Sequence, residues 1–184
     1  MPSQSPKRAS SKGKKGVDKD DVLLEARIEG FKIEYPRNLL LAFGLVSAFL
    51  PVYMAHAFFA VDWASLVNLV LFLITIGTAG NLLSQAYSVM VETEFLKRQR
   101  HYNETKSEKD AAVLRQLRLN VALAYSIFFV NALFVVVSSV LQGYILHQLD
   151  ARLSLLVAPN LTAFALLVLA KKNEEARQRK IGRA

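Results

Sequence analysis

The sequence predicts an all-α membrane protein, with four transmembrane helices arranged as two tight hairpins and a short cytosolic helical hairpin between them. Two observations predict this fold class. Four apolar stretches contain no Asp, Glu, Lys or Arg, and each can cross about 30 Å of hydrocarbon, with some tilt or thinning, at about 1.5 Å per helical residue. In addition, 22 of the 23 Lys and Arg residues lie outside the two short segments that join these stretches in pairs.

The four spans are Leu39 to Val61, Ala64 to about Tyr87, Val121 to about Leu146, and Leu153 to Ala170. Asp62 and Trp63 alone separate the first pair, and His147 to Arg152 separate the second, so each pair is expected to form a tight hairpin. Four spans place both termini and the central loop on one side of the membrane. Because basic loops stay cytoplasmic, that side is expected to be the cytosol.

The rest of the chain divides by composition. A basic tail rich in Ser, Lys and Gly (1–17) is expected to be disordered, and 18–38 is expected to be an amphipathic segment at the membrane surface, against a partner or on the protein's own cytosolic loop. The remaining divisions are hairpin 1 (39–91), a cytosolic helical loop (92–120), hairpin 2 (121–170) and a basic cytosolic tail (171–184). The first 38 residues hold no apolar h-region, so we expect no cleavable signal peptide, and the first span serves for targeting.

Small and polar residues within the spans predict helix packing. Gly44 with Ala48, and Gly80 with Ser84 and Ser88, are spaced four apart and would let neighbouring helices approach closely. We expect the polar residues of the spans to bond across helices or to lie near an interface: His56, Asn68, Asn81, Gln85, Asn131, Gln142 and Asn160. Trp63, Tyr144 and His147 are predicted to anchor the far interface.

No pattern in the sequence predicts catalysis. The chain has no Cys, no evident pairing of nucleophile and base, no His and carboxylate cluster and no Gly-rich phosphate loop. The spans also lack the acidic or basic relay that an ion-coupled carrier usually needs. We therefore expect a protein that is not an enzyme and that has no cofactor and no metal site.

The expected cytosolic side carries a strong positive charge. Its 22 basic and 13 acidic residues give a net charge of +9. Within the central loop, Glu92 to Arg100 can continue the second helix, and Ser107 followed by Asp110 resembles a helix start. Such a charge attracts polyanions, including RNA phosphate. The positive-inside rule and anionic lipid headgroups would produce the same pattern, so charge alone leaves both interpretations open.

Two runs resemble a known family, the gamma subunits of the translocon-associated protein (TRAP) complex, also called the signal sequence receptor. The run from Leu45 to Tyr53, followed by Asp62, resembles the first span of that family, and the run from Ser126 to Val137 resembles its third. The stretch from Asp21 to Leu24 and the Arg37-Asn38 pair are similar as well. The likeness covers most of the chain from 18 to 170, but the central loop is shorter than in animal members.

The resemblance implies a multi-pass subunit of the endoplasmic reticulum membrane that assists co-translational translocation. Its expected partners are other TRAP subunits, the Sec protein-conducting channel, membrane lipids, and the RNA of the large ribosomal subunit. The residues expected to contact the ribosome are Lys97, Arg98, Arg100, Arg115 and Arg118. Two other classes stay open from the residues: a small membrane channel or carrier, and a membrane-shaping protein.

Overall fold

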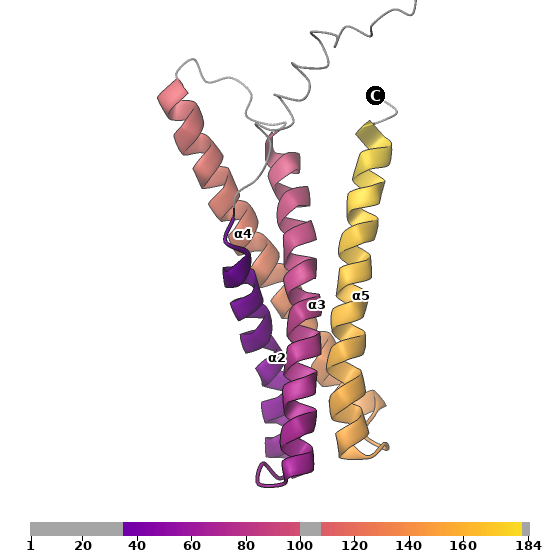
Figure 1. Ribbon diagram of the computed structural model, residues 1–184. Coiled ribbons are helices and arrows are strands. Elements are labelled where there is room, and N and C mark those ends of the chain that lie inside the picture. Colours follow the sequence, from indigo (N-terminus) through magenta and orange to yellow (C-terminus); the bar gives the residue numbers. More distant parts are fainter. Residues whose placement is uncertain (1–34, 100–107, 182–184) are drawn as a thin grey trace, which may run out of the picture. The chain divides into compact units, whose positions relative to one another are not determined.

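The computed structural model describes residues 35–99 and 108–181, and from Pro36 onward these residues belong to one compact unit. They form four α-helices, α2 (Arg37–Phe59), α3 (Leu66–Gln99), α4 (Glu108–Val140) and α5 (Ala151–Ile181), and a π-helical segment, η1 (Leu141–Ile145), that continues α4 (Figure 1). No strand occurs in these residues. Each helix is long and apolar enough to cross a membrane. For the described residues, the prediction of an all-α fold with four helices that could span a membrane is therefore confirmed.

The turn between α2 and α3 is longer than the sequence predicted. Helix α2 ends at Phe59 because Ala60 adopts a left-handed conformation with a φ of 52°. The Asp62 carboxylate then accepts a hydrogen bond of 3.0 Å from the Ala64 backbone N–H. The turn therefore covers 60–65, instead of Asp62 and Trp63 alone.

The second turn is bounded by a π-helix and a cap. Helix α4 passes into η1, which the sequence analysis did not predict. Helix α5 begins at Ala151, two residues before the predicted span. Its start is fixed by Asp150, whose carboxylate accepts a hydrogen bond of 2.8 Å from the Arg152 N–H, as an N-cap side chain does.

Three of the helices are longer than a bilayer requires. Helix α3 has 34 residues, α4 has 33 and α5 has 31, which corresponds to lengths of about 47 to 51 Å. A hydrocarbon core of about 30 Å leaves roughly 15 to 20 Å of each helix outside it. The central loop is thus mostly helical, although residues 100–107, which include Arg100, Asn103 and Ser107, lie outside the described residues.

Helix α3 is the centre of the packing and contacts α2, α4 and α5. Helices α2 and α3 approach closely at Gly44 and Gly80, where a Cβ atom on Gly44 would overlap the Gly80 carbonyl oxygen. The prediction that these small residues bring two helices together is confirmed. Large side chains could not occupy this position without separating the helices.

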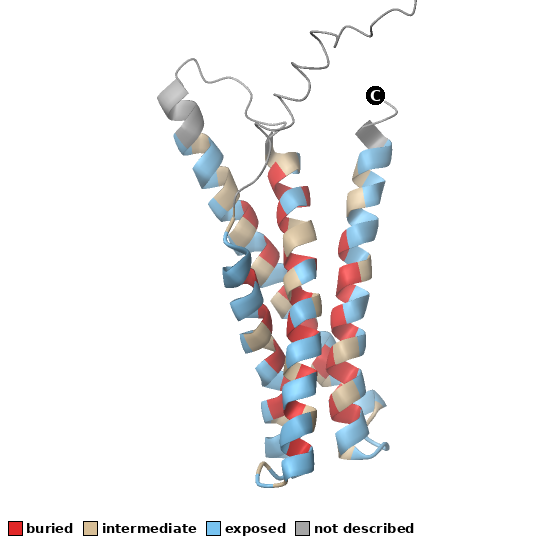
Figure 2. Cartoon of the chain, in the orientation of Figure 1, coloured by how far each residue is buried: buried red, intermediate tan, exposed pale blue. Residues whose placement is uncertain are grey.

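The buried residues follow one stripe of each helix, and the outward faces carry large apolar side chains (Figure 2). Phe128 is 74% exposed and Val46 is 71% exposed. Such extensive exposed apolar surface is expected where lipid or another membrane helix, rather than water, surrounds a bundle. Close to the turns, Val52, Phe72 and Leu155 bury their side chains in a shared cluster.

Trp63 packs into this cluster. Its ring centroid lies 5.1 Å from that of Phe72, 5.3 Å from that of His56 and 5.9 Å from that of Phe49. It was predicted to anchor the protein at the interface, but its ring is half-buried among these aromatic side chains. Tyr144, by contrast, is 79% exposed at the same end of the bundle.

Several of the polar residues in the spans bond across helices, as predicted. The Tyr87 hydroxyl of α3 donates to Asn131 Oδ1 of α4, and Thr78 Oγ1 of α3 donates to Asn160 Oδ1 of α5 at 2.7 Å. Near the first turn, His56 Nδ1 lies 2.9 Å from the Val61 carbonyl oxygen, and Asn68 Nδ2 donates to the Asp62 carbonyl. These contacts use the polar side chains to hold neighbouring segments together.

Candidate functional site at the basic end of the bundle

The two short turns lie at one end of the bundle, and the C-terminal ends of α3 and α5 lie at the other (Figure 1). The charged residues divide between these ends. Every Lys and Arg that the structure describes, except Arg152, lies at the end opposite to the turns: Arg37, Lys97, Arg98, Lys109, Arg115, Arg118, Lys171, Lys172, Arg177, Arg179 and Lys180. We call this end the basic end, and the other the turn end.

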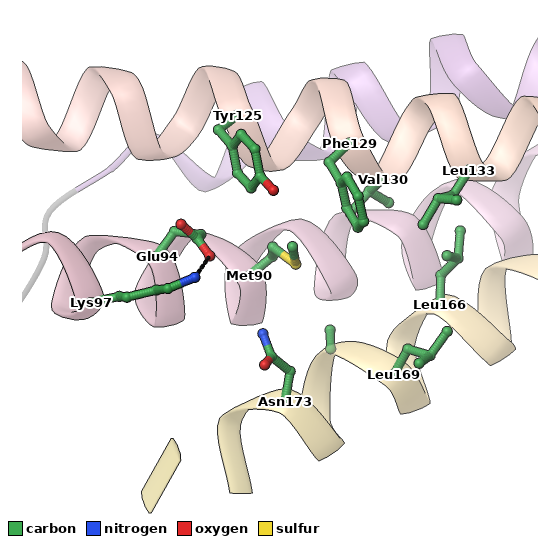
Figure 3. A pocket seen from close by; sticks show the side chains of 11 residues that line it. Met90, Glu94, Lys97, Tyr125, Phe129, Val130, Leu133, Leu166, Leu169 and Asn173 are labelled. Carbon is green, nitrogen blue, oxygen red and sulfur yellow. Dashed lines mark hydrogen bonds and ion pairs between the residues drawn. The ribbon is translucent and has the colours of Figure 1, made fainter. Parts of the chain in front are cut away.

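A buried carboxylate organises the basic residues of α3. Glu94 is only 6% exposed, and its two oxygens lie 3.4 Å from Lys97 Nζ and 3.8 Å from Arg98 Nε. The spacings of three and four residues place these groups on one helix face. Figure 3 shows the pair of Glu94 and Lys97. One buried negative charge is therefore paired with two positive charges. The cluster of Glu94, Lys97 and Arg98 has a net charge of +1.

Two contacts tie the basic ends of the helices together. The Arg98 guanidinium carbon lies 5.7 Å from the ring centroid of Tyr125, which joins α3 to α4 through a cation–π contact. On the other side of α3, Arg177 Nη1 of α5 donates a hydrogen bond of 3.2 Å to the Thr93 carbonyl oxygen. The basic end is thus a packed structure in which some of the cations have structural partners.

The residues predicted to contact a ribosome differ in their surroundings. The side chain of Lys97 is 68% exposed, and Arg115 is exposed as well. The side chain of Arg98 is only 33% exposed, and Arg118 is half-buried. The sequence predicted that Lys97, Arg98 and Arg100 face solvent. For Arg98 this was wrong, because Glu94 and Tyr125 hold its side chain against the bundle, and Arg100 lies outside the described residues.

A groove that the sequence analysis missed lies beside these charges. It has a volume of about 390 Å³ and is lined by side chains of α3, α4 and α5. Its lining residues are Met90, Glu94, Lys97, Tyr125, Phe129, Val130, Leu133, Leu166, Leu169, Ala170 and Asn173. On each helix most of them lie three or four residues apart, which is the spacing of one face, and Phe129-Val130 and Leu169-Ala170 are adjacent pairs on such a face. That spacing was visible in the sequence, but the convergence of three such faces was not.

The described part of the basic end holds more cationic than anionic residues, which suits the binding of anions. In residues 35–99 and 108–181, no three His, Asp or Glu side chains are grouped as metal ligands. Gln142 of η1 is 1% exposed, and its amide atoms have no hydrogen-bond partner among the described residues. It lies toward the turn end, far along α4 from the charged groups of the basic end.

The fold and the distribution of polar residues define a class of protein: an all-α, multi-pass membrane protein with one strongly basic end. Comparison of the chain with protein-family models and with curated proteins finds no match to either.

Proposed function

We propose that the protein is a non-catalytic subunit of a translocon-associated complex of the endoplasmic reticulum, contacts the ribosome and the Sec protein-conducting channel, and assists co-translational translocation. One observation carries the proposal. Each of the four helices carries basic residues at the basic end of the bundle. Among the described residues, only Arg152 is a basic residue at the turn end. Ribosomal RNA is a polyanion that such a surface attracts.

The excess of charge at the basic end supports binding to an anion. Beside its basic residues, the described part of this end holds six acidic residues: Glu92, Glu94, Glu108, Asp110, Glu174 and Glu175. Eleven basic residues against these six leave a net charge of +5. Because α3, α4 and α5 extend past the thickness of a bilayer, these charges project from the membrane toward a large partner.

The opposite end supports the role of a subunit within a complex. Two turns of about six residues leave almost no mass to act on a substrate beyond that face of the membrane. The outward faces of the helices offer apolar side chains, such as Phe128 and Leu73, on which other membrane helices can pack. The resemblance of the runs from Leu45 to Tyr53 and from Ser126 to Val137 to TRAP gamma subunits supplies the identity of the proposed complex.

Affinity purification in mild detergent tests this proposal. Tagged protein from solubilised microsomes is expected to copurify with ribosomes and the Sec channel, as identified by mass spectrometry. Raising the salt concentration in the wash should release the ribosomes first, since contacts with phosphate weaken with salt, and should leave contacts between membrane helices in place. A different four-span protein of the same membrane with a less basic cytosolic face serves as the control. Recovery of neither ribosomes nor the Sec channel above this control would contradict the proposal.

A further inference from the structure

The groove at the basic end changes in character along its length. Figure 3 shows Lys97 and Asn173 at one end, and Leu133 and Leu166 at the other. The spacing of seven residues between Met90 and Lys97 on α3 gives the groove a length of about 10 Å, roughly a third of the hydrocarbon core. The groove is therefore polar at the level where the helices become charged, and apolar where they enter the hydrocarbon.

The charges at the polar end favour an anion. The Glu94 carboxylate faces the groove but is balanced by Lys97 and Arg98. The Lys97 ammonium is exposed at the mouth, and Asn173 adds an amide that can donate. Lys171 and Lys172, both exposed, lie two residues and one residue before Asn173 on α5. Among the described residues, no other carboxylate lines the groove.

The apolar end of the groove suits a ligand with a hydrocarbon chain. Its walls are formed by Phe129, Val130 and Leu133 of α4 and by Leu166 and Leu169 of α5. A void of this size forfeits the dispersion contacts that its lining atoms would otherwise make, and a bilayer supplies acyl chains that restore them. One molecule that carries both an acyl chain and an anionic headgroup matches both ends of the groove.

We propose that this groove is a binding site for an anionic phospholipid, with one acyl chain between α4 and α5 and the headgroup phosphate at Lys97 and Asn173. The site lies on the bundle itself and does not depend on any ribosome or translocon partner. It would give the basic end a second ligand, whose negative charge offsets part of the positive charge there.

Photo-crosslinking in vesicles tests the site. The full-length protein is reconstituted in phosphatidylcholine vesicles with a trace of phosphatidylserine that carries a diazirine in its acyl chain, and labelled residues are mapped by mass spectrometry. Label is expected on the apolar lining, at Leu133 and Leu166. Ala170→Phe and, independently, Leu133→Trp should fill the groove and abolish label at Leu166. Val136→Phe adds bulk on an exposed face outside the groove and should leave that label unchanged.

The headgroup is tested with matched charge variants. The groove should take more label from the phosphatidylserine probe than from a phosphatidylcholine probe, and Lys97→Gln should lower this preference about fivefold. Arg152→Gln removes one charge at the turn end and should not lower it. Soluble glycerophosphate should fail to compete, because it lacks the chain. The proposal is overturned if groove-filling variants that elute like the wild type keep their label, if both lipids label equally, or if glycerophosphate displaces the probe.

Discussion

The backbones of Gly44 on α2 and Gly80 on α3 are in direct contact: a Cβ atom on Gly80 would lie 2.8 Å from Leu45 Cδ2 and 3.0 Å from Leu45 Cα. Any side chain at either glycine has to push the two helices apart. The first hairpin is therefore assembled around a pair of residues whose only contribution is the absence of a side chain.

Gly80→Leu is expected to destabilise the bundle by about 1 to 3 kcal/mol, the usual cost of forcing extra volume into a closely packed interface. Gly77→Leu, on the same helix, provides the control, because a Cβ atom there meets nothing within 4 Å. Unfolding in detergent, followed by circular dichroism during titration with sodium dodecyl sulphate, measures both. Equal stability of the two variants would contradict the close approach of α2 and α3.

Tyr87→Phe should lower the free energy of unfolding by about 0.6 kcal/mol, and by no more than about 1.7, as found for hydrogen bonds between membrane helices. The change removes the hydroxyl that donates to Asn131 and keeps the buried ring. Tyr53→Phe is the matched control, since Tyr53 is 53% exposed on the outer face of α2. In combination with Asn131→Leu, the Tyr87 substitution should cost less than it does alone. Additive effects would argue against the bond.

Much of this fold could be predicted from the sequence, and the exceptions have physical reasons. An uninterrupted apolar stretch is sufficient to predict a spanning helix, because every backbone group in lipid must be bonded internally. The helix ends could not be placed as well. They depend on the left-handed Ala60 and on the carboxylates of Asp62 and Asp150, which bond to nearby backbone N–H groups.

The candidate site was predicted less completely than the fold. The concentration of basic residues at one end can be predicted by counting Lys and Arg in the tails and the loops. How far each of these side chains is buried, and what it contacts, cannot be predicted in this way. The spacing of Glu94 to Lys97 and Arg98 was visible in the sequence, yet the burial of Glu94 depends on α4 and α5. The groove likewise exists only where faces of three helices converge, and no local pattern indicates which faces will meet.

Arg98→Gln is expected to cost about 1 kcal/mol of stability, because it removes one of the two cations that balance the buried Glu94, together with the contact to Tyr125. Adding Glu94→Gln should recover part of this stability. Arg179→Gln is the control: it breaks a pair with Glu175 in which both side chains are largely exposed, and it should change stability very little. If the two Arg variants behave alike, Glu94 is not the organising charge of the basic end.

The proposed orientation can be tested cleanly because the chain contains no Cys. Single cysteines are introduced at two exposed positions, Gln178→Cys at the basic end and Gln148→Cys at the turn end. A membrane-impermeant maleimide added to intact microsomes should label position 178 directly, and position 148 only after permeabilisation. The two glycosylation sequons of the chain, Asn103-Glu104-Thr105 and Asn160-Leu161-Thr162, should stay unmodified, since the first is predicted to be cytosolic and the second lies within a span. The reverse labelling pattern, or glycosylation at Asn103, would invert the orientation.

The most direct test of the account is the salt dependence of ribosome cosedimentation with the reconstituted protein. The variant to use is Lys97→Gln with Arg100→Gln and Arg115→Gln, because it keeps Arg98, whose side chain packs against Glu94 and Tyr125. For this triple variant we predict weaker binding and a slope of log affinity against log salt that is smaller by about three units, one for each phosphate group that the variant no longer neutralises. Arg152→Gln should bind as the wild type does. An unchanged slope in a correctly inserted triple variant would contradict the claim that these residues of the basic end bind ribosomal RNA.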